Sequence, residues 1–462
     1  MPDPVRRGIG PLAAAGLSFV WPGLGQLAQR RLVVAAVFGI PTVLVVALIV
    51  RLVLGDGRLE VAAATMLDPA VASAVLLAIV GVGLYRALAI WEAWRDGPAR
   101  TRGRRAWSTL VALLLGVVLM HGIGGYYALA FYQAGTAIFT GDQPSPTQGP
   151  SQPPESLQPG ETPTEGPSPG PTYPPSDRIS VLLMGVDSGH DRAHALTDTM
   201  LVVSLSPSQG TLTMISFPRD ISRFPLYFGG TYQTKLNSLM TAARNNPSAY
   251  PDPPATTLAN ELGYLLGIPI QYSAAINLEG FEQMVDIVGG VDVVNERAIS
   301  DPTYDWFDGT YGFYLRAGPQ HLDGRTALAF VRSRKGIGDN DFTRADRQQQ
   351  LLVALRAKLL NGAMLTRLPD LLKAASATVT TNMPPAKLRE YLGLADAISS
   401  AKVQRYVLGP PYATHPPTES TGGTYILELD LTRLAVLSVQ LFGRDSRYFQ
   451  EPAVSSPSPA VP

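Results

Sequence analysis

The fold depends on three apolar runs, Ile179-Ser-Val-Leu-Leu-Met-Gly-Val186, Met200-Leu-Val-Val-Ser-Leu205 and Leu212-Thr-Met-Ile-Ser-Phe217. The first run is almost continuously apolar, which is typical of a central strand that is buried on both faces. The turn sequence Pro207-Ser-Gln-Gly210 joins the second run to the third. We therefore predict three strands, of which the second runs antiparallel to the first and returns to the sheet edge where the first ends.

The segments after these strands alternate between helical and extended patterns. Helices are predicted over Thr256–Leu266 and Leu278–Val288, with a strand over Ile270–Asn277 between them. The segment Asp323–Val331 fits either a short helix capped by its first residue or a strand. Asp341 is suited to cap a long helix that runs to about residue 360. Strands mixed with helices indicate an α/β layered domain.

Arginine is concentrated in Ala329-Phe-Val-Arg-Ser-Arg-Lys335 and in Asp341-Phe-Thr-Arg-Ala-Asp-Arg-Gln-Gln349, although the formal net charge of the chain is zero. The residues of this stretch that suit planar contact with phosphate oxygens are Arg332, Arg334, Arg344, Arg347 and Gln348. If the last three lie on one helix, their i, i+3, i+4 spacing puts them on a single face. Taken alone, Arg347 is explained equally well as surface charge beside Asp346.

Carboxylates and one more arginine lie at the predicted edge of the sheet. Asp187 ends the first strand, Asp198 precedes the second, and Arg219 with Asp220 follows the third. Two carboxylates suit Mg²⁺, which prefers one or two of them together with phosphate oxygens of a substrate. Lys235 follows Asp220 at a short interval. It either contacts a phosphate or is an ordinary polar residue of a loop. Singly, each aspartate is explained as a turn or strand-entry residue; together they predict a metal-assisted phosphate site.

Other kinds of site are not indicated by the sequence. The chain has no cysteine, so disulfides and thiolate chemistry do not enter. It has no Gly-rich Walker loop, zinc-ligand spacing or Gly-x-Ser-x-Gly motif. A net charge of zero gives no support to nucleic-acid binding as the main task.

The N-terminal third contains apolar runs long enough to span a bilayer, which requires about 20 residues. The predicted spans are 32–54, 70–92 and 107–130. Residues 9–29 are also apolar but are interrupted by Pro22, Gly23 and Gly25. We interpret this segment as re-entrant or interfacial with a cytoplasmic N-terminus, and a fourth span is the alternative.

The arginine-rich loop between the second and third spans predicts the topology. Its arginines are Arg95, Arg100, Arg102, Arg104 and Arg105. By the positive-inside rule this loop is cytoplasmic, so the third span leads outward and the later residues lie outside the cell. We therefore expect a membrane region over 1–140, a Pro-, Ser- and Thr-rich extended stalk over 141–177, a globular domain over 178–450 and a disordered tail over 451–462.

An ordered series of short motifs resembles the LytR-CpsA-Psr family. The motifs are Gly185-Val-Asp-Ser188, Thr197-Asp-Thr-Met-Leu-Val-Val203, Ile215-Ser-Phe-Pro-Arg-Asp220, Lys235-Leu-Asn237, Gly280-Phe281, Val285-Asp-Ile-Val-Gly-Gly-Val-Asp292, Leu322-Asp-Gly324, Ala327-Leu-Ala-Phe-Val-Arg-Ser-Arg334 and Arg344-Ala-Asp-Arg-Gln-Gln349. Each is weak alone, but the series, over about residues 178–360, is specific. The resemblance implies a layered mixed-sheet domain outside the cell, with helices on both sheet faces and an apolar pocket for a lipid chain.

The resemblance also implies an activity and its participants. Members of the family attach glycopolymers, such as teichoic acid, from a polyprenyl-pyrophosphate carrier to peptidoglycan, usually at a muramic-acid hydroxyl. The implied partners are a polyprenyl-linked glycopolymer, a peptidoglycan acceptor and membrane lipid, and the implied cofactor is Mg²⁺. If water is the acceptor in place of peptidoglycan, the chain is a lipid-pyrophosphate phosphatase. A protein in place of peptidoglycan is another candidate acceptor. The alternative from a different class is a non-catalytic lipid-binding regulator in the membrane.

Site residues carry over by motif. The metal-binding aspartates correspond to Asp187 and Asp198. The residues that bind pyrophosphate correspond to Arg219, Arg332, Arg334 and Gln348, with Asp220, Lys235, Arg344 and Arg347 in support. We expect the first three arginines to stabilise the transition state, and Asp220 to act either as a base or as the partner that orients Arg219. The chain departs from the family pattern at Leu196, where many members carry arginine, and at Ile221, where threonine is frequent; Arg192 is a candidate substitute for the first.

Overall fold

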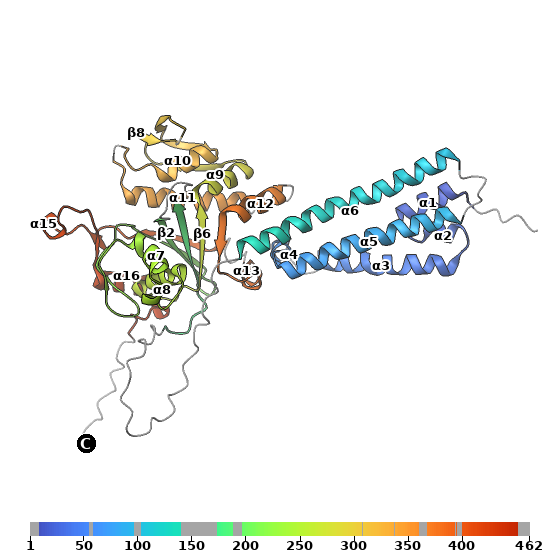
Figure 1. Cartoon of the computed structure of the whole chain (residues 1–462). Helices are drawn as coiled ribbons and strands as arrows, with labels where there is room; N and C mark the ends of the chain where they lie inside the picture. The colour runs from blue at the N-terminus through green and yellow to red at the C-terminus, as the bar shows by residue number, and fades with distance from the viewer. Residues whose placement is uncertain are drawn as a thin grey trace, which may run out of the picture. The chain divides into compact units, whose positions relative to one another are not determined.

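The computed structural model describes residues 9–54, 59–96, 103–139, 173–187, 196–306, 308–336, 338–359, 367–392, 394 and 400–450. Most of the predicted stalk, the predicted tail and Arg192 lie outside these residues. The chain divides into two compact units (Figure 1). One contains residues 1–136 with 385–393, and the other contains 137–384 with 394–462.

The first unit is helical throughout its described residues. Its helices are α1 (Pro11–Val20), α2 (Leu24–Ala28), α3 (Leu32–Leu54), α4 (Leu59–Met66), α5 (Pro69–Arg95), α6 (Arg104–Ile138) and α13 (Pro385–Leu392). By length and composition, α5 and α6 are able to cross a membrane. The first predicted span, 32–54, coincides with α3, whose described apolar part, Leu32–Leu48, is shorter. Crossing of the membrane by α3 stays a prediction.

The interrupted segment before α3 consists of two short helices rather than one. Gly23, between α1 and α2, has φ +99°, and a Cβ there would lie 2.6 Å from the Ala35 carbonyl oxygen. Only glycine therefore allows both the left-handed turn and the close approach to α3. The break explains why this apolar segment cannot form a continuous helix.

The second unit is built on strands with helices packed against them. Its strands are β1 (Ile179–Asp187), β2 (Leu196–Ser206), β3 (Thr211–Phe217), β4 (Phe224–Pro225), β5 (Thr231–Tyr232), β6 (Tyr272–Asn277), β7 (Val291–Asn295), β8 (Ile299–Asp305), β9 (Tyr311–Leu315), β10 (Gly318–Leu322), β11 (Val379–Thr381), β12 (Lys402–Val407), β13 (Ala413–Thr414) and β14 (Glu428–Leu429). Its α-helices are α7 (Leu239–Asn245), α8 (Pro254–Leu266), α9 (Leu278–Ile287), α10 (Gly324–Arg332), α11 (Asp341–Leu359), α12 (Leu368–Thr378), α15 (Thr418–Thr421) and α16 (Leu431–Phe442).

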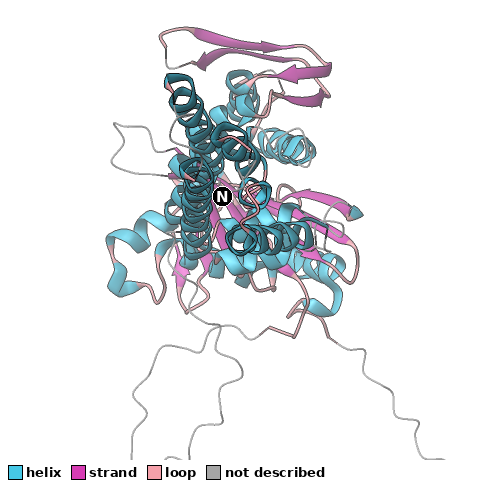
Figure 2. Cartoon of the chain, turned by 90° about the vertical axis from the view of Figure 1, so that its right-hand side faces the viewer, coloured by secondary structure: helices cyan, strands magenta, loops and turns pink. Residues whose placement is uncertain are grey.

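The main sheet is mixed and has the strand order β11-β6-β1-β2-β3-β12. As predicted, β2 runs antiparallel to both β1 and β3. The additional strands β6 and β12 run parallel to β1 and β3 respectively. Figure 2 shows the β8–β9 hairpin at the top of the view, apart from this sheet.

Successive residues of the strands face two different cores, because side chains alternate along a strand. Leu182 and Met184 of β1 pack with Leu258 and Leu262 of α8 and with Leu434 of α16. The opposite face, which carries Leu183 and Leu201, is covered by α9, α10 and α11 around a cavity. The predicted α/β sheet with helices on both faces is therefore confirmed, and Figure 1 locates these helices.

Two local predictions around the arginine-rich stretch are resolved by the structure. The segment after Asp323 is a helix, α10, and the Asp323 carboxylate accepts a hydrogen bond from Thr326 N at 2.8 Å. The strand alternative is therefore wrong. Asp341 begins α11, but Asn340 is the cap, since its Oδ1 accepts hydrogen bonds from Phe342 N and Thr343 N, both at 2.9 Å. Asp341 is consequently available for other contacts.

Candidate functional site

The cavity between the sheet and helices α9 to α11 has a volume of about 520 Å³ and differs in character along its length. Charged and amide side chains line it at the start of β2, the end of α10 and the start of α11; they include Asp198, Arg332, Arg334, Arg344 and Gln348. Further along β2 and α11, and on α9, its wall is apolar, with Leu201, Phe281, Met284, Leu351 and Leu355. Eleven residues of helix α11, about 16 Å, separate Arg344 from Leu355. One cavity therefore has a polar, arginine-rich end and an apolar end.

Residues that flank β2 and β3 extend the polar end of the cavity through Asp198, although Arg219, Asp220 and Lys235 are not themselves among the residues that line it. The Arg219 guanidinium donates a hydrogen bond to Asp198 Oδ1 at 2.7 Å, and its Nε lies 3.6 Å from Asp220 Oδ2. Lys235 Nζ lies 2.5 Å from Asp220 Oδ1, and Asp220 is buried. Because two cations hold Asp220, its arrangement favours the orienting role over that of a general base.

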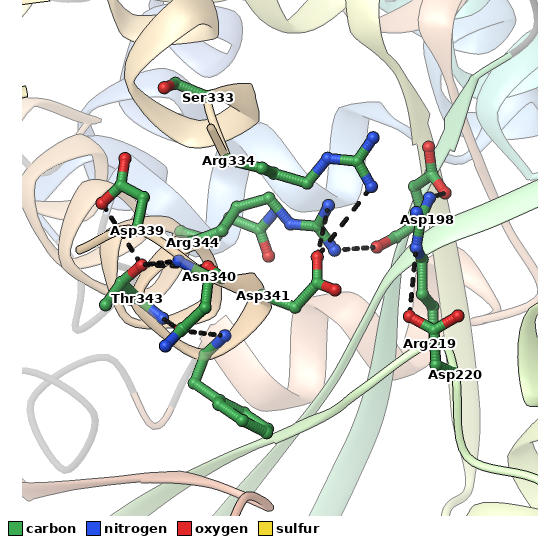
Figure 3. Close-up of polar contacts among 12 residues, drawn as sticks. Asp198, Arg219, Asp220, Ser333, Arg334, Asp339, Asn340, Asp341, Thr343 and Arg344 are labelled. Carbon is green, nitrogen blue, oxygen red and sulfur yellow. Dashed lines mark hydrogen bonds and ion pairs between the residues drawn. The ribbon is translucent and has the colours of Figure 1, made fainter. Parts of the chain in front are cut away.

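The remaining part comes from α10, α11 and the loop between them. Arg344 contacts Asp341 Oδ1 at 3.1 Å and donates to the Asp198 carbonyl oxygen at 3.4 Å. Arg334 lies 4.0 Å from the same Asp341 oxygen. Burial lowers the pKa of Arg344 to about 10, so it remains cationic at neutral pH. Figure 3 shows that these side chains converge on the Asp198–Arg219 pair.

We call Asp198, Arg219, Asp220, Arg334, Asp341 and Arg344 the polar cluster. Asp341 is the member that the sequence identified only as a helix cap. Its separation of three residues from Arg344 was the available signal for a contact on the helix surface. The contact to Arg334 depends on the loop geometry between α10 and α11.

Three further predicted site residues lie outside the polar cluster, namely Arg332, Gln348 and Arg347. Arg332 and Gln348 line the cavity, and Gln348 also donates to the Val331 carbonyl oxygen at 3.3 Å. Arg347 is not among the residues that line the described cavity. It is buried, donates to the Ser333 carbonyl oxygen at 2.6 Å and pairs with Asp339 at 3.2 Å. Its contacts hold the loop that carries Arg334.

Asp301 on β8 supports the same loop and was not anticipated from the sequence. Its carboxylate accepts hydrogen bonds from Ser333 Oγ at 2.8 Å and from Lys335 N at 3.2 Å, on either side of Arg334. Thr303 N donates to the other carboxylate oxygen at 3.2 Å. Burial alone would raise the pKa of Asp301, but these hydrogen bonds outweigh burial and lower it.

Replacing Asp301 with asparagine is expected to reduce the free energy of unfolding by about 1–3 kcal/mol at pH 7. One carboxylate oxygen becomes an NH2 group, which cannot accept a hydrogen bond, whereas both oxygens of Asp301 now accept hydrogen bonds, from Ser333, Lys335 and Thr303. Since the folded-state pKa lies below the unfolded value, this stabilisation is present above about pH 4 and disappears as the pH falls through the folded-state pKa. Thermal unfolding of both proteins between pH 3 and 8 checks this. Glu296→Gln, at an exposed position, is the control. A loss of unfolding free energy in Asp301→Asn that is equal at all pH values would contradict the lowered pKa of Asp301.

The predicted metal ligands lie on neighbouring strands. Asp187 pairs with Leu196 through the backbone, two residues before Asp198, next to a register irregularity between Gly185 and Val186. The Asp187 side chain lies outside the described part of the chain. Asp198 is 36% exposed and lines the cavity. Among described residues no group of three or more acidic or histidine side chains could hold a metal. Mg²⁺ prefers one or two carboxylates together with phosphate oxygens of a substrate, and Asp198 supplies one such carboxylate at the cavity wall.

Known proteins resemble this chain over the second unit. The model of the LytR_cpsA_psr family matches residues 160–438. The polyisoprenyl-teichoic acid–peptidoglycan teichoic acid transferase TagU of Halalkalibacterium halodurans is 32% identical over 207 residues, which are 45% of this chain and 62% of that protein. The protein of the same name from Oceanobacillus iheyensis is 27% identical over 305 residues, which are 65% and 86% of the two chains.

A likeness is also found among solved structures. The crystal structure of B. subtilis TagV has a TM-score of 0.46 and 24% identity, covering 60% of this chain and 100% of that one. This chain spans 62% of the length of the Halalkalibacterium relative. The family model, however, covers more than half of the chain and includes every residue of the polar cluster. The protein therefore belongs to the LytR-CpsA-Psr family.

Proposed function

We propose that this protein transfers a teichoic-acid-type glycopolymer from a polyprenyl-pyrophosphate carrier to peptidoglycan outside the cell. The observation that carries the proposal is the two-ended cavity, in which an apolar wall continues from a group of arginines. A polyprenyl pyrophosphate has the matching chemistry, since its lipid chain is apolar and its head carries several negative charges. The transferase names of the relatives support the same reaction class.

The arginines of the polar cluster and their carboxylate partners would have chemical roles in this reaction. Phosphoryl transfer requires positioning and charge neutralisation more than covalent participation of the protein. Arg219, Arg334 and Arg344 would neutralise the charge that develops on the phosphate oxygens, in a site already organised by Asp198 and Asp341. Arg332 and Gln348 would bind the pyrophosphate where the apolar wall begins. The lipid phosphate would leave while a sugar hydroxyl attacks.

Asp187 and Asp198 are the residues that would hold Mg²⁺ in this proposal. The cation would supply further charge neutralisation at the pyrophosphate. The hydrogen bond from Arg219 to Asp198 would keep one carboxylate oriented toward the cavity, whether or not the cation is present.

The proposal also places the protein in the cell membrane. We infer that α5 and α6 cross the bilayer and that the loop between them, which is rich in arginine, is cytoplasmic. The catalytic unit would then lie on the side of the membrane where peptidoglycan is located. The crossing of α3 would make the chain a three-span protein.

Reconstituted transfer tests the function. The full-length protein in lipid nanodiscs is mixed with a radiolabelled disaccharide on undecaprenyl pyrophosphate, and uncrosslinked peptidoglycan is added or omitted. We expect label to enter peptidoglycan only when the acceptor is present. Release of labelled sugar phosphate at the same rate without acceptor would indicate a phosphatase instead. Tight lipid binding with no product in either condition would indicate a non-catalytic regulator.

A further inference from the structure

We propose that Tyr425 and His415 form a stacking surface for a sugar ring of the acceptor glycan, beside Asp220 of the polar cluster. The inference rests on the proposed transfer reaction, because it identifies where the second substrate binds. Both residues follow the last motif that resembles the family, so no motif assigns them a role.

The two rings form a preorganised and accessible pair. Their centroids are 4.9 Å apart with an angle of 30° between the ring planes, and Tyr425 is 50% exposed. His415 Nδ1 lies 2.8 Å from the Ile426 carbonyl oxygen. A carbonyl oxygen only accepts, so Nδ1 carries the proton in this contact, and Nε2 of the neutral ring is an acceptor. An aromatic face with polar groups at its rim is suited to a sugar, which presents C–H groups on its faces and hydroxyls at its edge.

The backbone holds this pair next to the polar cluster. Leu427 N donates to the Asp220 carbonyl oxygen at 2.9 Å, and Ser222 N donates to the Leu427 carbonyl oxygen at 2.8 Å. Tyr425 is therefore two residues from a direct backbone contact with Asp220. Arg223 adds a second attachment, since it contacts Glu428 Oε1 and the Ser420 carbonyl oxygen, both at 2.9 Å.

The charges of Asp220 and Asp341 also act on the Tyr425 hydroxyl. Partial burial, followed by the negative charges of these two carboxylates, raises the pKa of Tyr425. The hydroxyl therefore stays protonated at neutral pH and is able to donate a hydrogen bond to a sugar oxygen. An isolated surface tyrosine would not be influenced by both carboxylates at once.

The direction of the reaction assigns the pair to the acceptor. The lipid phosphate is the leaving group, and its chain would occupy the apolar end of the cavity. The attacking and leaving oxygens of a phosphoryl transfer lie roughly in line, so the acceptor hydroxyl approaches from the side away from the cavity. Neither Tyr425 nor His415 is among the residues that line the cavity. A sugar stacked on Tyr425 would bring its hydroxyl toward the phosphate from the required side.

Kinetics of full-length variants in nanodiscs test the proposal. We expect Tyr425→Ala to raise the KM for uncrosslinked peptidoglycan about tenfold or more and to leave the KM for the lipid donor within about twofold. Tyr425→Phe keeps the ring and is expected to retain most of the acceptor binding. His415→Ala removes one ring of the pair and should give an intermediate effect. Tyr311→Ala, at a tyrosine that is 68% exposed on β9, is the matched control.

A binding measurement separates failure of this proposal from failure of the proposed function. Saturation-transfer NMR with a soluble peptidoglycan disaccharide-tetrapeptide is expected to show contact in the wild type and in Tyr311→Ala, and to lose it in Tyr425→Ala. This result is independent of turnover. An unchanged acceptor KM and NMR signal in Tyr425→Ala would overturn the proposal. A rise in the donor KM alone would also overturn it, because Tyr425 would then contact the donor.

Discussion

Replacing Arg334 with alanine is expected to lower the rate of glycopolymer transfer about 100- to 1000-fold, which is the effect of removing one preorganised charge-stabilising group from a phosphoryl-transfer site. Its side chain is 37% exposed, compared with 23% for Arg219 and 8% for Arg344. Its ion pair with Asp341, at 4.0 Å, is also longer than the pairs of Arg219 with Asp198 and of Arg344 with Asp341. Arg334 is therefore the cluster arginine best placed to contact a substrate and least needed for folding.

Two further variants make this expectation specific. Arg334→Lys keeps the charge but loses the planar fork that contacts two oxygens at once, so we expect an intermediate rate. Arg433→Ala removes an exposed arginine that pairs with Asp430 at 3.1 Å on α16, and it should transfer at the wild-type rate. Transfer rates are compared at matched thermal stability. Wild-type activity of a folded Arg334→Ala protein would remove Arg334 from the catalytic group.

The neighbouring Arg344 is expected to behave differently under the same substitution. It is buried and links α11 to the Asp198 carbonyl oxygen and to Asp341. Its removal would leave buried polar groups without partners, which costs stability as well as activity. Loss of the exposed Arg334 is therefore expected to lower activity alone, whereas loss of the buried Arg344 is expected to lower both activity and stability.

The central strands and their shared edge could be predicted because they depend on short-range patterns. Apolar runs separated by a turn predict antiparallel β1, β2 and β3, and this order alone brings Asp198 near Arg219. Contacts between elements that are far apart in the sequence cannot be predicted from such short-range patterns. Asp301 lies more than thirty residues before the loop it supports, and Tyr425 lies more than two hundred residues after Asp220. Their positions follow from packing and not from spacing.

The arginine-rich helix shows where a spacing argument is too coarse. Residues i, i+3 and i+4 share one broad face, but consecutive residues on an α-helix differ by about 100°. Arg344 and Gln348 line the cavity on one side of α11, whereas Arg347 turns toward Asp339 and the Ser333 carbonyl oxygen. The prediction placed all three toward the substrate. Two of them line the cavity, and the third holds the loop that carries Arg334.

Replacing Ala274 with phenylalanine is expected to block the lipid-binding end of the cavity. Ala274 lies on β6 opposite Leu183 of β1, and both line the cavity. A phenyl ring at position 274 would therefore occupy space that we assign to the polyprenyl chain. We expect co-purifying polyprenyl lipid, measured by mass spectrometry, to fall about tenfold, with an increase of at least that size in the donor KM.

The same substitution should cost little stability, because the ring enters an existing cavity and does not displace packed side chains. Ala298→Phe, at an exposed position before β8, is the matched control and should retain both lipid and activity. A folded Ala274→Phe protein with wild-type lipid content and donor KM would show that the chain of the donor lies elsewhere. The apolar end of the cavity would then have no assigned ligand. The arginines alone would not favour a lipid pyrophosphate over other phosphates.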